Sequence, residues 1–144
     1  MNIKENSKIL KLSYVFKNYE NEIKEAKQTK KDYEEFLDEL LEKEINQRKE
    51  NGIKKRIRYA KFPIKKYLED FDRKLYNPEF IKEFEELDTL DFIEKKENII
   101  LVGTPGAGKT HYAIGLGIKA CMDGKSVLFI SVPNLIIELK EAMC

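Results

Sequence analysis

The chain has 144 residues, of which 42% are hydrophobic and 37% charged, with no tryptophan and a formal net charge of +1. This length fits about one domain, and the composition is typical of a soluble globular protein with charged helices and excludes a disordered chain. A secreted or membrane-spanning protein is also excluded, because the sequence has no signal-peptide core and no run of about 18 apolar residues. Cys121 and Cys144 form no disulfide framework, so we predict a cytoplasmic protein.

Residues 1–66 are predicted to form a helical N-terminal region. Apolar residues recur at helical spacing from Ile9 to Ala60. Asn51-Gly52 interrupts this pattern and allows either a turn or a weakened continuous helix. Pro63 disfavours helical geometry in the residue before it, so the last helix of this region should end near Phe62.

Residues 67–97 are predicted to connect this region to the next and to contain short helices. Pro78 suits the first position of a helix that runs from about Glu79 to Leu87. Asp88 or Thr89 would cap one further helical turn that reaches Lys95.

Residues 98–144 change to the spacing of an α/β fold. NIILV (98–102) and SVLFIS (126–131) are short apolar runs typical of strands buried on both faces. Helices are predicted over 109–122 and 133–143. We therefore predict an α/β protein in which a helical region precedes the first β-α-β-α part of a parallel sheet.

The segment from Gly103 to Thr110, called the glycine loop below, fits the Walker A pattern G-x-x-x-x-G-K-[ST] in full. Its glycines let backbone N–H groups point at phosphate oxygens, and the following helix adds the positive end of its dipole. Lys109 would supply a charge between the β- and γ-phosphates, and the Thr110 hydroxyl would bind Mg²⁺. ATP and Mg²⁺ are the predicted ligands, and a strand-to-helix turn without a ligand is the alternative. The candidate cofactor-binding residues are Gly103, Thr104, Pro105, Gly106, Ala107, Gly108, Lys109, Thr110 and His111.

His111 is the only histidine and falls in the first turn of the predicted helix. It would contact the nucleotide or a neighbouring segment, and a structural role is the alternative to a catalytic one, because no carboxylate or nucleophile lies beside it in the sequence. Gly115 and Gly117 are poor helix formers, so we predict that they allow this helix to pack closely on the sheet.

Three stretches of the chain resemble a known family. They are RIRYAKFPIKKYLEDFD (56–72), ENIILVGTPGAGKTHYAIGLGIKAC (97–121) and SVLFISVPNLIIELKEA (126–142). Together they resemble the IstB-like ATP-binding proteins, which are helper ATPases of a class of bacterial transposons and relatives of the DnaC-type helicase loaders among the AAA+ ATPases. The resemblance covers roughly residue 30 to the end, and its most specific parts are Lys-Phe-Pro with Leu-Glu-Asp-Phe-Asp, and Gly-Lys-Thr-His after the loop glycines.

The resemblance implies an ATP-driven homo-oligomer that assembles on DNA and passes target DNA to a transposase, with the N-terminal helical region contacting DNA and partners. The stretch from Arg48 to Lys66, which carries many bases and only one acid, Glu50, then becomes a candidate for non-specific contact with the DNA backbone. A solvated helix face is the alternative. The candidate DNA-binding residues are Lys54, Lys55, Arg56, Arg58 and Lys61.

In related loaders the segment before the first strand helps to hold the adenine. Tyr67, Leu68 and Phe71 are therefore candidates for adenine contact, and core contacts between the two parts of the chain are the alternative.

Further parts that the resemblance implies are missing from the sequence. The family continues with an acidic Walker B strand, a sensor strand, an arginine finger and a helical lid, and none follows the second predicted strand. We therefore predict no catalytic residue, no useful ATP turnover by this chain alone, and an incomplete sheet in a C-terminally truncated fragment. A helicase-loader fragment and a non-catalytic module that binds DNA or a transposase are the alternative functions.

Overall fold

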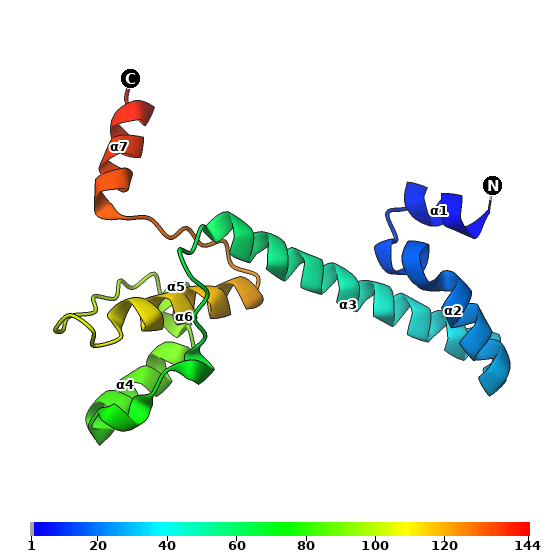
Figure 1. Ribbon diagram of the computed structural model, residues 1–144, viewed down its shortest axis with the longest axis horizontal. Coiled ribbons are helices and arrows are strands. Elements are labelled where there is room, and N and C mark those ends of the chain that lie inside the picture. The colour runs from blue at the N-terminus through cyan, green and yellow to red at the C-terminus, as the bar shows by residue number, and fades with distance from the viewer. Residues whose placement is uncertain (1) are drawn as a thin grey trace. The chain divides into compact units, whose positions relative to one another are not determined.

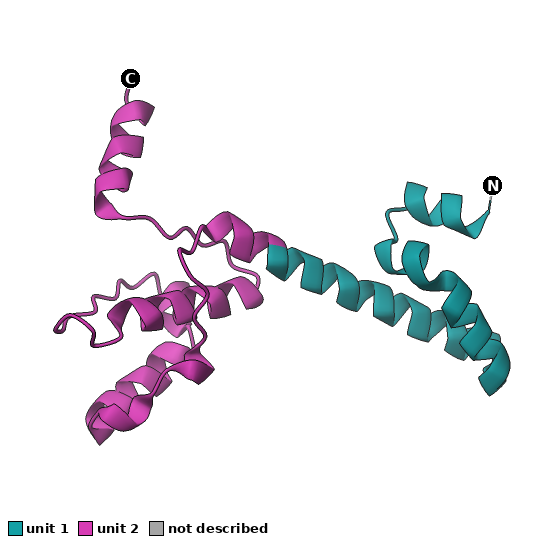
Figure 2. Ribbon diagram, in the orientation of Figure 1, with its two compact units in different colours: residues 1–54 teal, residues 55–144 magenta. Residues whose placement is uncertain are grey.

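The computed structural model describes residues 2–144 as helices joined by non-helical segments (Figure 1). The chain divides into two compact units, Met1–Lys54 and Lys55–Cys144, called the N-terminal unit and the C-terminal unit below (Figure 2). The division between residues 54 and 55 falls within one helix.

The N-terminal unit contains α1 (Ile3–Ile9), α2 (Ser13–Thr29) and the larger part of α3 (Tyr33–Ala60). The predicted helical character of this region is confirmed. α3 continues through Asn51-Gly52, so the continuous helix is the alternative that the structure adopts. It ends at Ala60, close to the predicted end, and Lys61 follows with a left-handed backbone.

Glu44 of α3 holds the beginning of α2. The residue is only 3% exposed, and its side-chain oxygens accept the backbone N–H groups of Ser13 at 2.9 Å, Tyr14 at 2.8 Å and Val15 at 3.1 Å. The first N–H groups of a helix have no acceptor within the helix, and negative charge is favoured at that end. One buried carboxylate thus joins α3 to the start of α2.

The C-terminal unit begins with the last residues of α3 and continues with shorter helices. Its 3-10 helices are η1 (Leu68–Asp70) and η2 (Arg73–Leu75). Its further α-helices are α4 (Pro78–Asp88), α5 (Asp91–Glu94), α6 (Lys109–Met122) and α7 (Val132–Ala142).

The sequence patterns predicted several of these helix limits. Pro78 occupies the first turn of α4, and the Asn77 side chain caps that helix by accepting the N–H of Phe80 at 3.1 Å. The N-cap of α5 is Leu90 and not the predicted Asp88 or Thr89, although the Thr89 hydroxyl accepts the N–H of Asp91 at 3.2 Å. The bounds of α6 agree with the predicted range 109–122.

The core of the C-terminal unit forms around α6. Tyr112, Ile114, Ile118 and Cys121 of this helix are fully buried. Burial raises the pKa of the Cys121 thiol, which therefore stays protonated at neutral pH. α6 thus supplies the buried side chains around which the other elements of this unit pack.

The predicted α/β fold is wrong for this structure, because residues 2–144 contain no strand. The runs 98–102 and 126–131 are non-helical but unpaired with each other; Ile100 is 85% exposed and Val102 90% exposed. The Phe129 N–H donates to the Ala60 carbonyl at 2.7 Å, which ties the second run to α3. An apolar β-branched run favours extended chain, but a strand also needs a neighbouring strand for its backbone groups.

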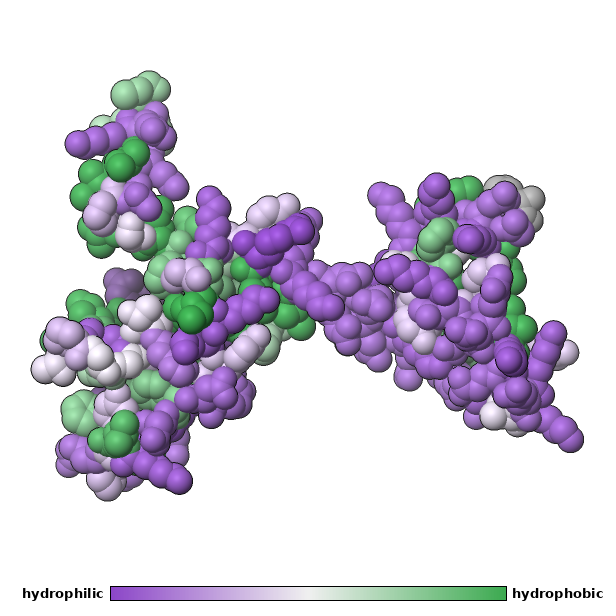
Figure 3. Space-filling view, viewed as in Figure 1, coloured by the Kyte–Doolittle hydropathy of each residue, from purple (hydrophilic) through white to green (hydrophobic). Residues whose placement is uncertain are grey.

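α7 is exposed along its whole length in the described structure. Its apolar side chains include Leu135, Ile136 and Leu139, and Figure 3 shows hydrophobic side chains over this helix. None of the described helices combines the length and the apolar character needed to cross a bilayer.

Candidate nucleotide-binding site

The glycine loop needs glycine at two positions. Gly106 has a φ of 80° and Gly108 a φ of 81°, a left-handed conformation that L side chains rarely adopt. At Gly108 space is also limiting, because an added Cβ would lie 2.8 Å from Cε2 of Phe71. Between them, the Ala107 N–H donates to the Thr104 carbonyl at 3.2 Å and closes a turn.

The loop leads directly into the N-terminus of α6, where backbone donors are free. Gly108 is the N-cap and offers no side-chain cap. Within residues 2–144, the N–H groups of Gly108, Lys109, Thr110 and His111 donate to no protein acceptor. The first such bond comes from Tyr112, whose N–H donates to the Gly108 carbonyl at 2.9 Å. Free N–H groups at a helix N-terminus suit an anion, so these residues fit a phosphate group.

The two residues predicted to bind phosphate and metal lie at this helix start. Lys109 Nζ donates to the carbonyls of Gly103 at 2.8 Å and Thr104 at 2.6 Å, which places its charge across the loop. Thr110 is exposed. No cluster of His, Cys, Asp and Glu in the described residues could hold a metal ion by itself. Thr110 therefore fits Mg²⁺ only together with phosphate oxygens.

The loop rests on an aromatic cluster formed by Phe71, Tyr76, Phe84, His111 and Tyr112. Phe71 contacts each of the other members, with ring centroids 5.1 to 5.6 Å apart. The Tyr76 hydroxyl donates to the Ala107 carbonyl within the glycine loop. The connecting segment of residues 67–97 thus contacts the glycine loop through its aromatic side chains.

His111 takes a structural position. Its Nε2 lies 3.0 Å from the Tyr67 carbonyl, and its ring meets Phe71 edge-on with centroids 5.5 Å apart. The predicted close packing at Gly115 and Gly117 occurs, but against different partners. A Cβ at Gly115 would lie 2.7 Å from Leu68 of the connecting segment, and one at Gly117 would lie 2.8 Å from Phe62, which follows α3. α6 therefore packs on these residues and not on a sheet.

Asp88 joins the cluster to two cations, whereas its place in the sequence suggested only a helix cap. It accepts the Tyr112 hydroxyl at 2.9 Å and pairs with Arg73 at 2.5 Å, and its carbonyl accepts Lys119 Nζ. Burial and the hydrogen bond to Asp88 raise the pKa of Tyr112 far above its ordinary value, so this phenol stays protonated. Only the helical spacing of Tyr112 in the apolar face of α6 could have indicated its burial.

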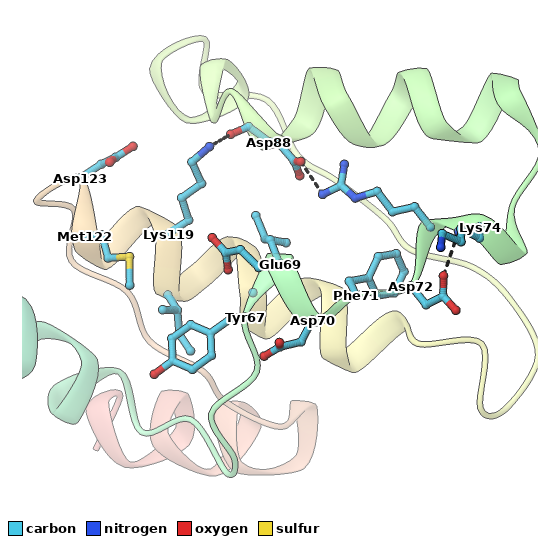
Figure 4. Close-up of a pocket in the computed structure, with 14 residues that line it drawn as sticks. Tyr67, Glu69, Asp70, Phe71, Asp72, Lys74, Asp88, Lys119, Met122 and Asp123 are labelled. Atoms are coloured by element: carbon cyan, nitrogen blue, oxygen red, sulfur yellow. Dashed lines mark hydrogen bonds and ion pairs between the residues drawn. The ribbon is translucent and has the colours of Figure 1, made fainter.

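A cavity of about 770 Å³ lies over the second half of α6, at η1 and η2 (Figure 4). Tyr67, Leu68 and Phe71 all line it, whereas no residue of the glycine loop does. Phe71 is buried and Leu68 packs against the core, so both make core contacts. Tyr67 is more exposed and stays a candidate for adenine contact.

The candidate DNA-binding residues separate into two kinds. Lys54, Lys55, Arg58 and Lys61 are exposed. Arg56 is half-buried, and its Nε donates to the Cys121 carbonyl at 2.7 Å, at the last turn of α6.

The sequence of the chain matches a known protein family over almost its whole length. The sequence profile of the family described as "IstB-like ATP binding protein" matches residues 5–143. The chain belongs to this family. The match also extends further toward the N-terminus than the resemblance from about residue 30 indicated.

Proteins similar to this chain are named after insertion sequences. A protein of Pseudomonas aeruginosa, named as an ATP-binding protein of insertion sequence IS21, is 39% identical over 133 residues, which are 92% of this chain and 50% of that protein. One of Geobacillus stearothermophilus, from insertion sequence IS5376, is 39% identical over 110 residues, or 76% of this chain and 44% of that protein. The chain spans about half the length of these relatives.

Proposed function

We propose that the glycine loop binds ATP together with Mg²⁺ and that the chain serves as an ATP-binding helper of an insertion sequence. One observation carries the proposal: free N–H groups at the start of α6 stand beside Lys109 and Thr110. Membership of an ATP-binding family supports ATP as the nucleotide.

The residues of the loop have distinct tasks in this proposal. The backbone N–H groups bind phosphate oxygens, and Lys109 neutralises charge on the β- and γ-phosphates. Thr110 contributes a hydroxyl to Mg²⁺, which screens the remaining phosphate charge. His111 supports the first turn of α6 through the Tyr67 carbonyl and does not contact the nucleotide in this proposal.

We further propose that residues 1–144 hold the nucleotide without useful turnover. Phosphoryl transfer depends on groups that position water and stabilise charge. The acids after the loop are Asp123, Glu138 and Glu141, and in the described structure none of them is hydrogen-bonded to a loop residue. Phosphate release at the buffer rate, in the presence of bound ATP analogue, is the expected result.

The proposed partners are the DNA backbone, a transposase and further copies of the chain, in the cytoplasm. Exposure of Lys54, Lys55, Arg58 and Lys61 supports non-specific DNA contact. Arg56 contributes less in this proposal, because its guanidinium is bonded to the end of α6. The insertion-sequence names of the relatives favour the transposition helper over a helicase-loader fragment.

Titration with a fluorescent ATP analogue and Mg²⁺ tests the nucleotide proposal. We expect Lys109→Ala to weaken binding at least about tenfold, because a charge-assisted contact is worth roughly 1.5–3 kcal/mol. Lys140→Ala, which removes an exposed lysine from α7, is the matched control and should leave binding unchanged. Binding that does not depend on Lys109 would contradict the proposal.

A further inference from the structure

The Tyr76 hydroxyl reaches the glycine loop from a distant part of the chain. It donates to the carbonyl of Ala107, 31 residues further along. Its ring is fixed by stacking on Phe71, with centroids 5.6 Å apart and planes at 29°, and by edge contact with Phe84 at 5.0 Å and 87°. Because the ring cannot turn freely, the position of its hydroxyl is fixed by the aromatic cluster.

This hydrogen bond orients the Gly108 N–H as well as the Ala107 carbonyl. The Ala107 C=O and the Gly108 N–H belong to one planar trans peptide, in which they point to opposite sides. Holding the carbonyl against Tyr76 therefore directs the Gly108 N–H away from the aromatic cluster. That N–H is one of the free donors at the start of α6.

The glycines make such a support necessary. Gly106 and Gly108 allow the left-handed backbone that the loop requires, but glycine also permits many other conformations. A peptide between Ala107 and Gly108 would rotate easily if nothing held it. The contact from His111 to the Tyr67 carbonyl fixes the first turn of α6 but leaves the Ala107 carbonyl untouched. In the described structure, Tyr76 is the side chain that bonds this carbonyl.

We propose that Tyr76 is a positioning residue for nucleotide binding, because its hydroxyl holds the Ala107–Gly108 peptide with the N–H directed toward a phosphate group. This inference rests on the proposed binding of ATP by the glycine loop. Tyr76 touches no nucleotide in this account. It raises affinity by removing the conformational freedom that the loop would otherwise lose on binding.

Tyr76→Phe tests the inference in the 144-residue chain, because it deletes the hydroxyl and keeps the ring. We expect affinity for a fluorescent ATP analogue with Mg²⁺ to fall about threefold to tenfold, the range for loss of one neutral hydrogen bond. Tyr59→Phe is the matched control, since Tyr59 is exposed and its hydroxyl makes no hydrogen bond within the described residues. Circular dichroism checks that both variants keep their helices.

A second measurement separates positioning from loss of fold. Ala107-Gly108 is the only Ala-Gly dipeptide in the sequence, so labelling alanine carbonyls with ¹³C and glycine nitrogens with ¹⁵N selects the Gly108 amide resonance. We expect this resonance to move when ATP and Mg²⁺ are added to the wild type. In Tyr76→Phe it should be displaced before addition and move less afterwards, while helix content is unchanged.

The outcomes distinguish the two proposals. If the wild type shows no binding that depends on Lys109, nucleotide binding itself fails. If the wild type binds through Lys109, but Tyr76→Phe binds equally well with the same Gly108 response, only the role of Tyr76 fails. Equal losses in Tyr76→Phe and Tyr59→Phe would also overturn it.

Discussion

The two units are each held together by different kinds of contact. The N-terminal unit has a buried carboxylate, Glu44, and the C-terminal unit has a cluster of aromatic rings. Glu44 binds the first N–H groups of α2, so the N-terminal unit depends on directed polar contacts. Phe71 and Tyr112 belong to the buried core of the C-terminal unit, which depends on apolar contact. Hydrogen bonds fix the orientation of the groups they join but bury little apolar surface, whereas packed rings bury much more. The candidate nucleotide site lies on the packed rings of the aromatic cluster.

Phe71→Ala should have the largest effect, because it removes the ring that contacts every other member of the aromatic cluster. We expect the C-terminal unit to lose about 3–5 kcal/mol of unfolding free energy, as for other buried phenylalanines. Hydrogen exchange resolved by residue would measure the loss in α6 and in α2 separately. Exchange in α2 should stay unchanged, and equal loss in both helices would contradict a separate core for this unit.

Glu44→Ala should affect the other unit. Removal of the carboxylate leaves the first N–H groups of α2 without their acceptor, at a cost of about 2–3 kcal/mol. Glu42→Ala is the matched control in α3. Its side chain is exposed and makes no hydrogen bond or ion pair within the described residues, so its removal should cost less than about 0.5 kcal/mol. If both variants speed exchange in α2 equally, the polar account of the N-terminal unit is wrong.

In both units the sequence predicts local structure better than contacts between distant residues. Pro78 and the spacing of apolar residues around Tyr112 indicated helices that the structure contains, because capping and helical periodicity are local properties. The contacts of Glu44 with α2 and of Tyr76 with Ala107 join residues about thirty positions apart. No local pattern specifies which distant groups meet, so these contacts required the structure.

The wrong prediction of strands has a related cause. NIILV (98–102) and SVLFIS (126–131) have the composition of buried strands, but composition describes one segment and a strand requires two. Phe129 instead donates to the Ala60 carbonyl at the end of α3. The glycine loop was predicted from its motif together with the apolar run before it and the helix after it. The sheet expected to support it is absent, and residues of the connecting segment contact the loop instead.

Replacing the loop glycines by alanine tests how rigidly the aromatic cluster supports the glycine loop. Gly106→Ala and Gly108→Ala meet the same left-handed backbone, which costs about 1–2 kcal/mol in each. Gly108→Ala also meets Phe71 at 2.8 Å, and overpacking should add about 1–2 kcal/mol. Urea unfolding of the two variants measures this difference. Equal midpoints would mean that the aromatic cluster yields at Gly108 and does not support the loop rigidly.

Removing the charge of Arg58 should have the smallest effect of these substitutions. It tests whether the exposed bases near the end of α3 bind the DNA backbone. If Arg58 contacts one DNA phosphate, Arg58→Gln should lower the slope of log affinity against log salt by about 0.9 and weaken binding by about 1 kcal/mol near 0.15 M salt. Lys140→Gln, an exposed lysine in α7, is the control. Arg56 is unsuitable for this test, because its bond to the Cys121 carbonyl mixes charge with stability. The loss should be the same on two duplexes of unrelated sequence, since phosphate contacts read no bases; a loss on only one would assign Arg58 to base recognition.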